Sequence, residues 1–286
     1  MSPRLARWES RGVTLLGDPA RPGGVAFAFT ERGGGVSLPP YDSLNLGMNT
    51  GDDPAAVAEN RARALAALGV DAASAARLVS PRQVHGTRCL VVDDASPAAL
   101  ARVAAEAEAG ADAVCCSVPG VPVMLCFADC LPVVLVAPGA FAVAHSGWRG
   151  TLGRVSAAAL AELLAASGAC ADEVSAYVGP HVSGGDYEVS EELLARFEGE
   201  FGSMVRVAGS RLDLARAVRA TLEGEGVPAD RIVECDASTA SCTDRFFSYR
   251  AEGGTCGRLA AIAWMDPAGA RGRTADVDGG EPDGVA

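Results

Sequence analysis

The sequence contains no lysine, so all 24 of its basic residues are arginine. This absence excludes three kinds of active site: a phosphate-binding loop built around a lysine, a Schiff-base lysine and a lysine general base. The net charge of −12 also leaves no basic surface that could neutralise the phosphates of a nucleic acid. Any anion must therefore be bound by arginine or by backbone amides, and we expect no nucleic-acid partner.

Long apolar runs and Cys-x-x-Cys pairs are also missing. No stretch reaches the roughly 18 apolar residues of a membrane-spanning helix, so we expect no membrane association. The segment Met1-Ser2-Pro3-Arg4 lacks the apolar part of a secretory signal, and we therefore expect a cytoplasmic protein whose nine cysteines are reduced. The absence of a Cys-x-x-Cys pair argues against a zinc ribbon and a thioredoxin-type redox site.

The apolar content, in contrast, is sufficient for a sizeable core. Hydrophobic residues make up 49% of the 286 positions, which suits one large domain or two small ones. Residues 1–22 are mixed and contain proline, so we expect a flexible N-terminal arm. No repeat or linker interrupts residues 23–265, which are predicted to form a single catalytic domain. Residues 266–286 show no periodicity, and we expect a disordered tail there.

Short apolar runs alternate with helical patterns along residues 23–265. This alternation predicts an α+β fold in which several strands are buried on both faces. We predict strands over residues 24–30, 88–92, 113–117, 121–127, 132–136, 141–144, 174–178, 231–235 and 259–264. We predict helices over residues 55–68, 97–109, 151–167, 191–198 and 212–223.

Two of the three histidines and one cysteine lie where apolar runs begin or end. These residues are His85, Cys130 and His145. Two imidazoles and a thiolate suit Zn²⁺ with a fourth position left open, and an open position indicates catalysis rather than a structural role. The three residues are far apart in the sequence, however, so spacing alone leaves open that they are unrelated.

Each candidate also has an ordinary interpretation. A single turn histidine such as His85 is commonly bonded to backbone, and a single buried cysteine is usually a small hydrophobe. His145 is more suggestive, because it precedes the glycine-rich turn Ser146–Gly150, which offers backbone amides and Arg149 to an anion. Asp129 could orient a ligand or accept a proton, and His181 could lie at the rim of the site or be an ordinary loop residue.

Several motifs occur together in one order along the chain. They are Gly34-Gly35-Val36-Ser37, Ser43-Leu44-Asn45-Leu46-Gly47, Gly51-Asp52-Asp53-Pro54, Gln83-Val84-His85-Gly86, Ala128-Asp129-Cys130-Leu131-Pro132-Val133, Ala144-His145-Ser146-Gly147-Trp148-Arg149-Gly150 and Phe247-Ser248-Tyr249-Arg250. Over about residues 25–265 the chain resembles the bacterial YfiH/YlmD family. Its members are also called multicopper polyphenol oxidase, purine nucleoside phosphorylase or peptidoglycan editing factor.

The resemblance implies an α/β/β/α sandwich with mixed β-sheets, built from repeated α-β-β units. It also implies a zinc or copper ion held by His85, Cys130 and His145. The implied activities are phosphorolysis of adenosine, inosine and methylthioadenosine, and deamination of adenosine. We expect Arg149, Asn45 and Arg32 to bind the substrate, a small-molecule nucleoside with phosphate, and we expect a monomer.

Three other functions remain open. Cys130 could be the nucleophile of a hydrolase or amidase that edits peptidoglycan precursors, with His145 or His85 as its base. The chain could also be a non-enzymatic partner in cell division or wall assembly. An oxidase with several copper ions fits least well, because three histidines cannot supply the roughly ten imidazoles of a full copper cluster.

Overall fold

The structure is a computed structural model that describes residues 2–267. Its strands are β1 (Ala6–Ser10), β2 (Val13–Gly17), β3 (Val25–Thr30), β4 (Cys89–Val92), β5 (Ala113–Cys116), β6 (Val123–Phe127), β7 (Leu131–Ala137), β8 (Ala140–Ser146), β9 (Ser175–Val178), β10 (Ile232–Glu234) and β11 (Leu259–Met265). Its α-helices are α1 (Pro54–Ala67), α2 (Ala72–Ala75), α3 (Pro97–Ala109), α4 (Trp148–Leu152), α5 (Val155–Ser167), α6 (Glu191–Phe201) and α7 (Leu214–Gly224). Within residues 2–267, none of the helices combines the length and the apolar character needed to cross a membrane.

The strands form two sheets. The first is antiparallel, with the order β1-β2-β3-β11-β6. The second has the order β10-β9-β7-β8-β5-β4; its two edge pairs are parallel and its inner pairs are antiparallel. The second sheet is therefore mixed, as the resemblance predicts.

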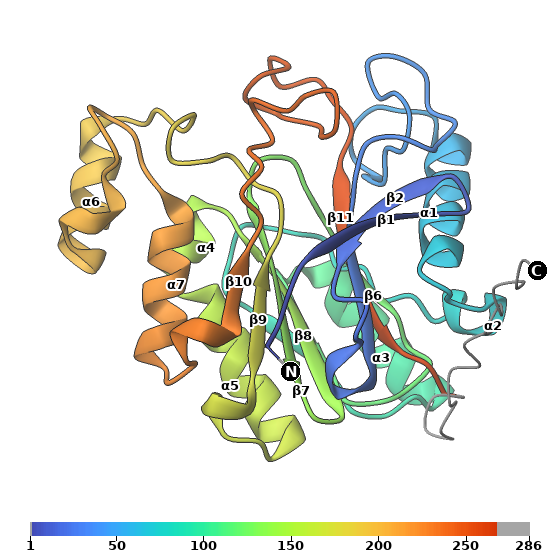
Figure 1. Cartoon of the computed structure of the whole chain (residues 1–286). Helices are drawn as coiled ribbons and strands as arrows, with labels where there is room; N and C mark the ends of the chain where they lie inside the picture. The colour runs from blue at the N-terminus through green and yellow to red at the C-terminus, as the bar shows by residue number, and fades with distance from the viewer. Residues whose placement is uncertain (1, 268–286) are drawn as a thin grey trace, which may run out of the picture.

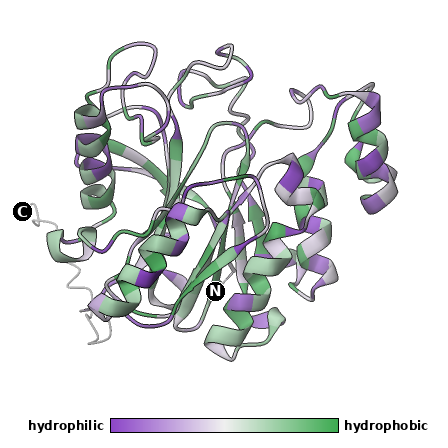
Figure 2. Ribbon diagram, turned by 180° about the vertical axis from the view of Figure 1, so that it is seen from behind, coloured by the Kyte–Doolittle hydropathy of each residue, from purple (hydrophilic) through white to green (hydrophobic). Residues whose placement is uncertain are grey.

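The molecule has four layers of secondary structure, and an apolar cluster lies between each layer and the next. The first cluster lies between the sheets and includes Phe27 and Phe29 of β3 together with Tyr177 of β9. The second joins the outer face of the mixed sheet to α5, α6 and α7, and the third joins the outer face of the antiparallel sheet to α1. In Figure 1, α1 lies on one side of the sheets and α5 and α7 lie on the other. Figure 2 shows green in the strands and mixed colours along the covering helices, as expected for amphipathic outer layers. The α/β/β/α sandwich is therefore confirmed.

The N-terminal segment differs from the prediction. We expected residues 1–22 to be a flexible arm, but β1 and β2 form a hairpin, and β2 pairs with β3. The strand β1 could not be predicted from an apolar run, because it lies at the edge of the sheet with one face exposed and carries few apolar residues. Of the expected disordered tail, residues 268–286 lie outside the described part of the chain.

The helix predicted over residues 151–167 is divided in two. Arg154 has a left-handed backbone (φ 60°), which separates α4 from α5. Its guanidinium forms an ion pair with Glu200 of α6 at 2.8 Å. The break ends α4 at Leu152 and begins α5 at Val155, while Gly147, the residue before α4, lies beside His85 and Cys130.

Candidate metal centre

The register of two neighbouring strands brings Cys130 close to His145. β7 begins at Leu131, directly after Cys130, and β8 ends at Ser146, directly after His145. The strands are antiparallel, with Leu131 opposite Ser146 and Pro132 opposite His145. The thiol and the imidazole therefore lie at the same edge of the mixed sheet, although a long hairpin separates them in sequence.

The third residue, His85, is placed by a buried carboxylate. Asp112 is fully buried and lies directly before β5. Its side chain accepts hydrogen bonds from three successive backbone amides, those of Val84 (3.1 Å), His85 (2.9 Å) and Gly86 (2.7 Å). These bonds hold His85 in a left-handed conformation (φ 58°), which is uncommon for a residue other than glycine. The loop is thereby fastened above the ends of β7 and β8.

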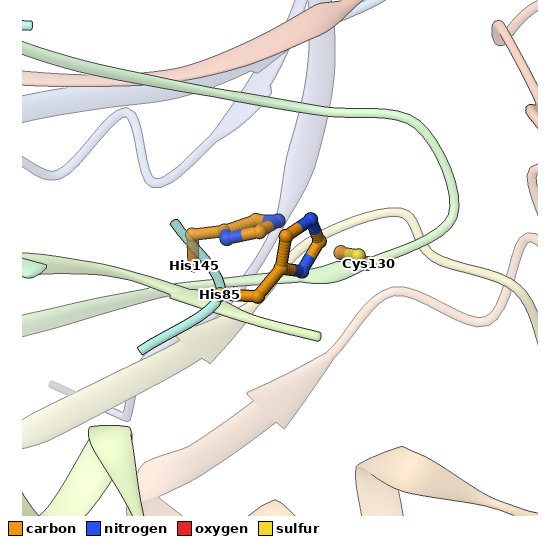
Figure 3. Close-up of side chains that lie close together, drawn as sticks. All are labelled: His85, Cys130 and His145. Carbon is orange, nitrogen blue, oxygen red and sulfur yellow. The ribbon is translucent and has the colours of Figure 1, made fainter. Parts of the chain in front are cut away.

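The potential ligand atoms of His85, Cys130 and His145 all lie within 4.8 Å of one another. The two imidazole rings are 4.9 Å apart between centroids and meet at 66°. Figure 3 shows the rings and the sulfur converging from three separate segments of the chain. The prediction that the three residues lie together is supported by this geometry.

The site has one buried side and one exposed side. His145 is 5% exposed, Cys130 is half-buried and His85 is exposed. The site is therefore reachable from solvent at the His85 side.

The charges in the site favour a thiolate. Burial opposes ionisation of Cys130, but the charge of His145 and hydrogen bonds with His145 and His85 outweigh it and lower the pKa of Cys130 to about 6. Burial likewise opposes protonation of His145, but the negative charge of Cys130 and the hydrogen bond to Asp112 raise its pKa to about 9. The thiolate is the form that binds metals and attacks electrophiles.

These residues fit a zinc ion. The Nδ1 of His145 lies 2.9 Å from Oδ1 of Asp112; with Nδ1 protonated, Nε2 is left unprotonated as a ligand atom. Such a carboxylate–histidine pair is the usual support of a zinc-bound imidazole. Tetrahedral zinc at about 2.0 Å from nitrogen and about 2.3 Å from sulfur separates such ligands by about 3.3–3.6 Å, so the donors need to approach by up to about 1.5 Å. Two nitrogens and one sulfur suit zinc, and copper also accepts this set.

Gly147 leaves room for this arrangement. A Cβ atom added there would lie 2.8 Å from Nδ1 of His85 and 3.0 Å from Sγ of Cys130. The backbone of Gly147 is extended (φ −73°), so its conformation would allow another residue. Glycine is needed here because of the space taken by the two ligands.

The structure assigns the orienting role to Asp112 rather than to Asp129. The Asp129 carboxylate accepts hydrogen bonds from the hydroxyls of Thr239 (2.6 Å) and Ser248 (2.7 Å) and from the amide of Arg250 (2.6 Å). It therefore fastens residues 239–250 beside the Cys130 turn. Sequence reasoning missed Asp112; the available signal was a carboxylate directly before a fully apolar strand, where an unpaired charge would be costly.

Tyr187 is a second residue that sequence reasoning missed. Burial raises its pKa to about 12, and the nearby charge of Cys130 adds to the effect. The guanidinium of Arg250 lies 5.2 Å from the centre of its ring. Tyr187 therefore stays protonated at neutral pH, and its hydroxyl can act as a donor.

The three expected substrate-binding residues occupy different environments. Arg149 is exposed, lies 4.4 Å above the Trp148 ring and has no carboxylate partner among residues 2–267. Arg32 donates hydrogen bonds to the carbonyls of Asp42 and Thr243 and to Glu252, and so it joins two loops. Of the three, Arg149 alone has a guanidinium free for a ligand.

Asn45 is completely buried. Its amide group donates to Thr50 and Asp52, and its carbonyl oxygen accepts from the amides of Gly47 and Arg258. A substrate could reach Asn45 only after this loop had opened. The hydrogen bonds of its side chain therefore stabilise the loop.

His181 is also buried, at 4% exposed, and its Nδ1 donates to the carbonyl of Gly179 at 2.8 Å. Its Nε2 lies 3.8 Å from Glu234. His181 is not among the convergent ligand atoms, as expected for a loop residue outside the metal set.

The chain is similar to several known proteins over most of its length. Residues 26–266 match the family described as "Multi-copper polyphenol oxidoreductase laccase". A protein of Deinococcus radiodurans named purine nucleoside phosphorylase is 41% identical over 256 residues, which cover 88% of this chain and 92% of that protein. A protein named adenosine deaminase RL5, from an unknown prokaryotic organism, is 34% identical over 244 residues. These residues cover 82% of this chain and 92% of that protein.

The crystal structure of YlmD from Geobacillus stearothermophilus has the same fold. The two structures superpose with a TM-score of 0.79 at 29% sequence identity, covering 91% of this chain and 98% of YlmD.

Proposed function

Because the chain belongs to the multi-copper polyphenol oxidoreductase laccase family, which includes the YfiH and YlmD proteins, we propose that it is a zinc-dependent purine nucleoside phosphorylase. The proposed substrates are adenosine, inosine and methylthioadenosine. The observation that carries the proposal is the convergence of His85, Cys130 and His145 on one point that solvent can reach. A bound zinc ion would supply Lewis acidity at that point.

A single ion is favoured over a group of coppers. Among residues 2–267, the only other cluster that could hold a metal is Cys170, Asp172 and Glu173, whose members are all exposed and include no histidine. Cu(II) centres of oxidases depend on several imidazoles. We therefore propose one metal ion per chain and no copper cluster.

The residues around the ligands suit the binding of a nucleoside and phosphate. In phosphorolysis a phosphate oxygen forms a bond to C1′ of the ribose, the bond from C1′ to the purine breaks, and the purine keeps the electron pair and gains a proton. Arg149 would bind the phosphate, since its guanidinium is exposed and unpaired in the described structure. Tyr187 would donate a hydrogen bond to the substrate from its protonated hydroxyl.

Deamination of adenosine is a second activity that we propose for the same site. The relative named adenosine deaminase RL5 supports it. In this reaction the oxygen of a water adds to the purine carbon that carries the amine, and ammonia leaves. Asp112 would contribute indirectly, by holding His145 in one tautomer.

The test is an incubation of purified, untagged protein with adenosine, inosine or methylthioadenosine, with and without phosphate. Release of free base that depends on phosphate is expected. Inosine formed from adenosine without phosphate would identify the deaminase. A Cys130→Ala variant should lose both, and an absence of turnover by zinc-loaded wild-type protein would contradict the proposal.

One observation favours a different enzyme. The lowered pKa of Cys130 and its contact with His145 also describe a cysteine nucleophile beside its base, as in a hydrolase or amidase. Treatment with a chelator separates the two. Loss of turnover that zinc restores supports the phosphorylase, whereas metal-free turnover that iodoacetamide abolishes supports the hydrolase.

A further inference from the structure

A cavity of about 450 Å³ opens between the end of α1 and strands β1 and β3. Its lining includes Trp8, Glu9, Arg11, Asp18 and Arg21, together with residues 66–69 at the end of α1. None of these residues belongs to the His85 loop, to β7 or to β8. The cavity is therefore separate from the metal centre.

The cavity exists because the antiparallel sheet is incomplete at this place. β2 pairs with β3 only at Leu15–Thr30 and Leu16–Phe29. The chain then turns away after Gly17, so the first part of β3 has no partner from β2. The end of α1 does not fill the gap, because it carries small residues there, Ala66 and Ala67.

One wall of the cavity is flat and aromatic. Trp8 of β1 is half-buried, and it packs partly against the apolar cluster beneath α1. A Cβ atom at Gly17 would lie 3.1 Å from the indole of Trp8, so the absence of a side chain there lets the ring lie against the sheet. An exposed indole face is a platform on which a planar ring can stack.

Two arginines border the cavity. Arg11 and Arg21 are exposed, and within residues 2–267 neither forms an ion pair or a side-chain hydrogen bond. Neither of the two carboxylates on the lining forms an ion pair with them in the described part of the chain. Both oxygens of Asp18 are bonded, one to the Ala20 amide and the other to the Arg4 amide and the Tyr177 hydroxyl.

The other carboxylate, that of Glu9, is exposed and forms no hydrogen bond or ion pair with Arg11 or Arg21 within the described residues. The two guanidiniums are therefore available to an anion such as phosphate.

The end of α1 supplies hydrogen-bond acceptors. In the described structure the backbone carbonyls of Ala67 and Leu68 accept no hydrogen bond, while those of Ala64, Leu65 and Ala66 do. Unpaired carbonyls at a helix C-terminus carry partial negative charge and attract N–H donors.

From this arrangement we propose that the cavity is a second ligand site that binds a purine nucleotide. The base stacks on Trp8, its amino group donates to the carbonyls of Ala67 and Leu68, and the phosphate lies between Arg11 and Arg21. The volume is in the range of ordinary small-molecule sites. The ligand differs from a nucleoside substrate by its phosphate, and the site is separate from the metal ligands.

The test is calorimetric titration of the full, zinc-loaded chain with adenosine 5′-monophosphate. Adenosine and ribose 5-phosphate serve as the two halves of that ligand. The whole nucleotide should bind more tightly than either half. Arg11→Ala and Arg21→Ala should each weaken its binding by about tenfold, since each removes a charged hydrogen-bond donor. Trp8→Leu should also weaken the binding of the nucleotide.

Two variants complete the experiment. Arg102→Ala changes an exposed arginine of α3 and should leave binding unchanged, as should Cys130→Ala. Loss of nucleotide binding in Cys130→Ala would assign it to the metal centre and overturn the proposal. The proposal would also be overturned if the nucleotide did not bind to the wild-type protein, or if Arg11→Ala and Arg21→Ala bound it as tightly as the wild type does. Both arginines are exposed, so circular dichroism should show an unchanged fold.

Discussion

At the scale of single residues, Asp112 links two of the three proposed metal ligands. One oxygen of its carboxylate lies 2.9 Å from both the His85 amide and the His145 ring. Its backbone carbonyl also accepts a hydrogen bond from the His145 amide at 2.7 Å. Burial opposes ionisation of Asp112, but hydrogen bonds from His145 and the Gly86 amide outweigh it and lower its pKa. The carboxylate therefore stays charged, and it holds the loop in place by accepting hydrogen bonds from the amides of Val84, His85 and Gly86.

An Asp112→Asn substitution should weaken zinc binding by about 10–100-fold, the usual effect of removing such a support. An amide can accept at one atom only, so it would turn an NH₂ group toward backbone N–H groups of the loop. Competition with a chromophoric chelator measures the affinity. Asp230→Asn, at an exposed position of the turn Ala229–Arg231, serves as the matched control. Wild-type affinity in Asp112→Asn would show that the loop does not depend on this carboxylate.

A Gly147→Ala substitution should also weaken zinc binding, by displacing His85 and Cys130. The added methyl would lie within about 3 Å of both ligands, while the backbone conformation permits alanine. The same chelator competition and a thermal melt measure the effect. Gly199→Ala, where nothing lies within 4 Å of the added atom, is the control. Equal zinc affinity in the two variants would contradict the proposed position of the ligands.

At the scale of elements, Glu31 fastens the N-terminal hairpin to the loop after β10. It follows β3, is 4% exposed and forms ion pairs with Arg7 of β1 at 2.7 Å and with Arg245 at 2.6 Å. Burial opposes its ionisation, but the hydrogen bonds and charges of the two arginines outweigh it and lower the pKa below the ordinary 4.5. This carboxylate, together with the pairing of β2 with β3, holds in the sheet a segment that was expected to be flexible.

A Glu31→Gln variant should have a free energy of unfolding about 2 kcal/mol lower than the wild type at pH 7, the scale of a charged hydrogen bond. Because the folded pKa is lowered, the stabilising contribution is complete above pH 4.5 and is lost as the pH falls further. Urea denaturation from pH 7 to 3 should show the two proteins converging in acid. The control is Glu9→Gln, at an exposed position of β1. A difference that persists unchanged at pH 3 would exclude the ion pairs as its cause.

The sequence predicted the elements of the core well because their apolar runs are long. The helix α3 was predicted with its observed bounds, and β5 to β8 were located within two residues or so of their ends. The edge strand β1 and its neighbour β2 were missed, since the pairing of β2 with β3 and the Glu31 ion pairs hold them in place. The left-handed turn at Arg154 was missed because arginine gives no local signal for it.

At the scale of the whole molecule, the candidate site depends on the order of strands in the mixed sheet. β5, β7 and β8 lie side by side, and their ends deliver Asp112, Cys130 and His145 to one edge. The residue types could be proposed from sequence, and the family resemblance, which the comparisons confirm, grouped them. Their convergence could not be derived from spacing, because it requires the strand register and the loop held by Asp112. Arg32 and Asn45 likewise could not be recognised as loop residues without their long-range hydrogen bonds.

The most direct test of the account is the metal content of untagged protein, measured by mass spectrometry together with protein concentration. We predict one zinc per chain in the wild type and in Cys170→Ala, which alters the exposed cluster, and none in Cys130→Ala or His145→Ala, with each variant folded by circular dichroism. A wild-type protein that is active without bound metal, or a Cys130→Ala variant that keeps its zinc, would contradict the account.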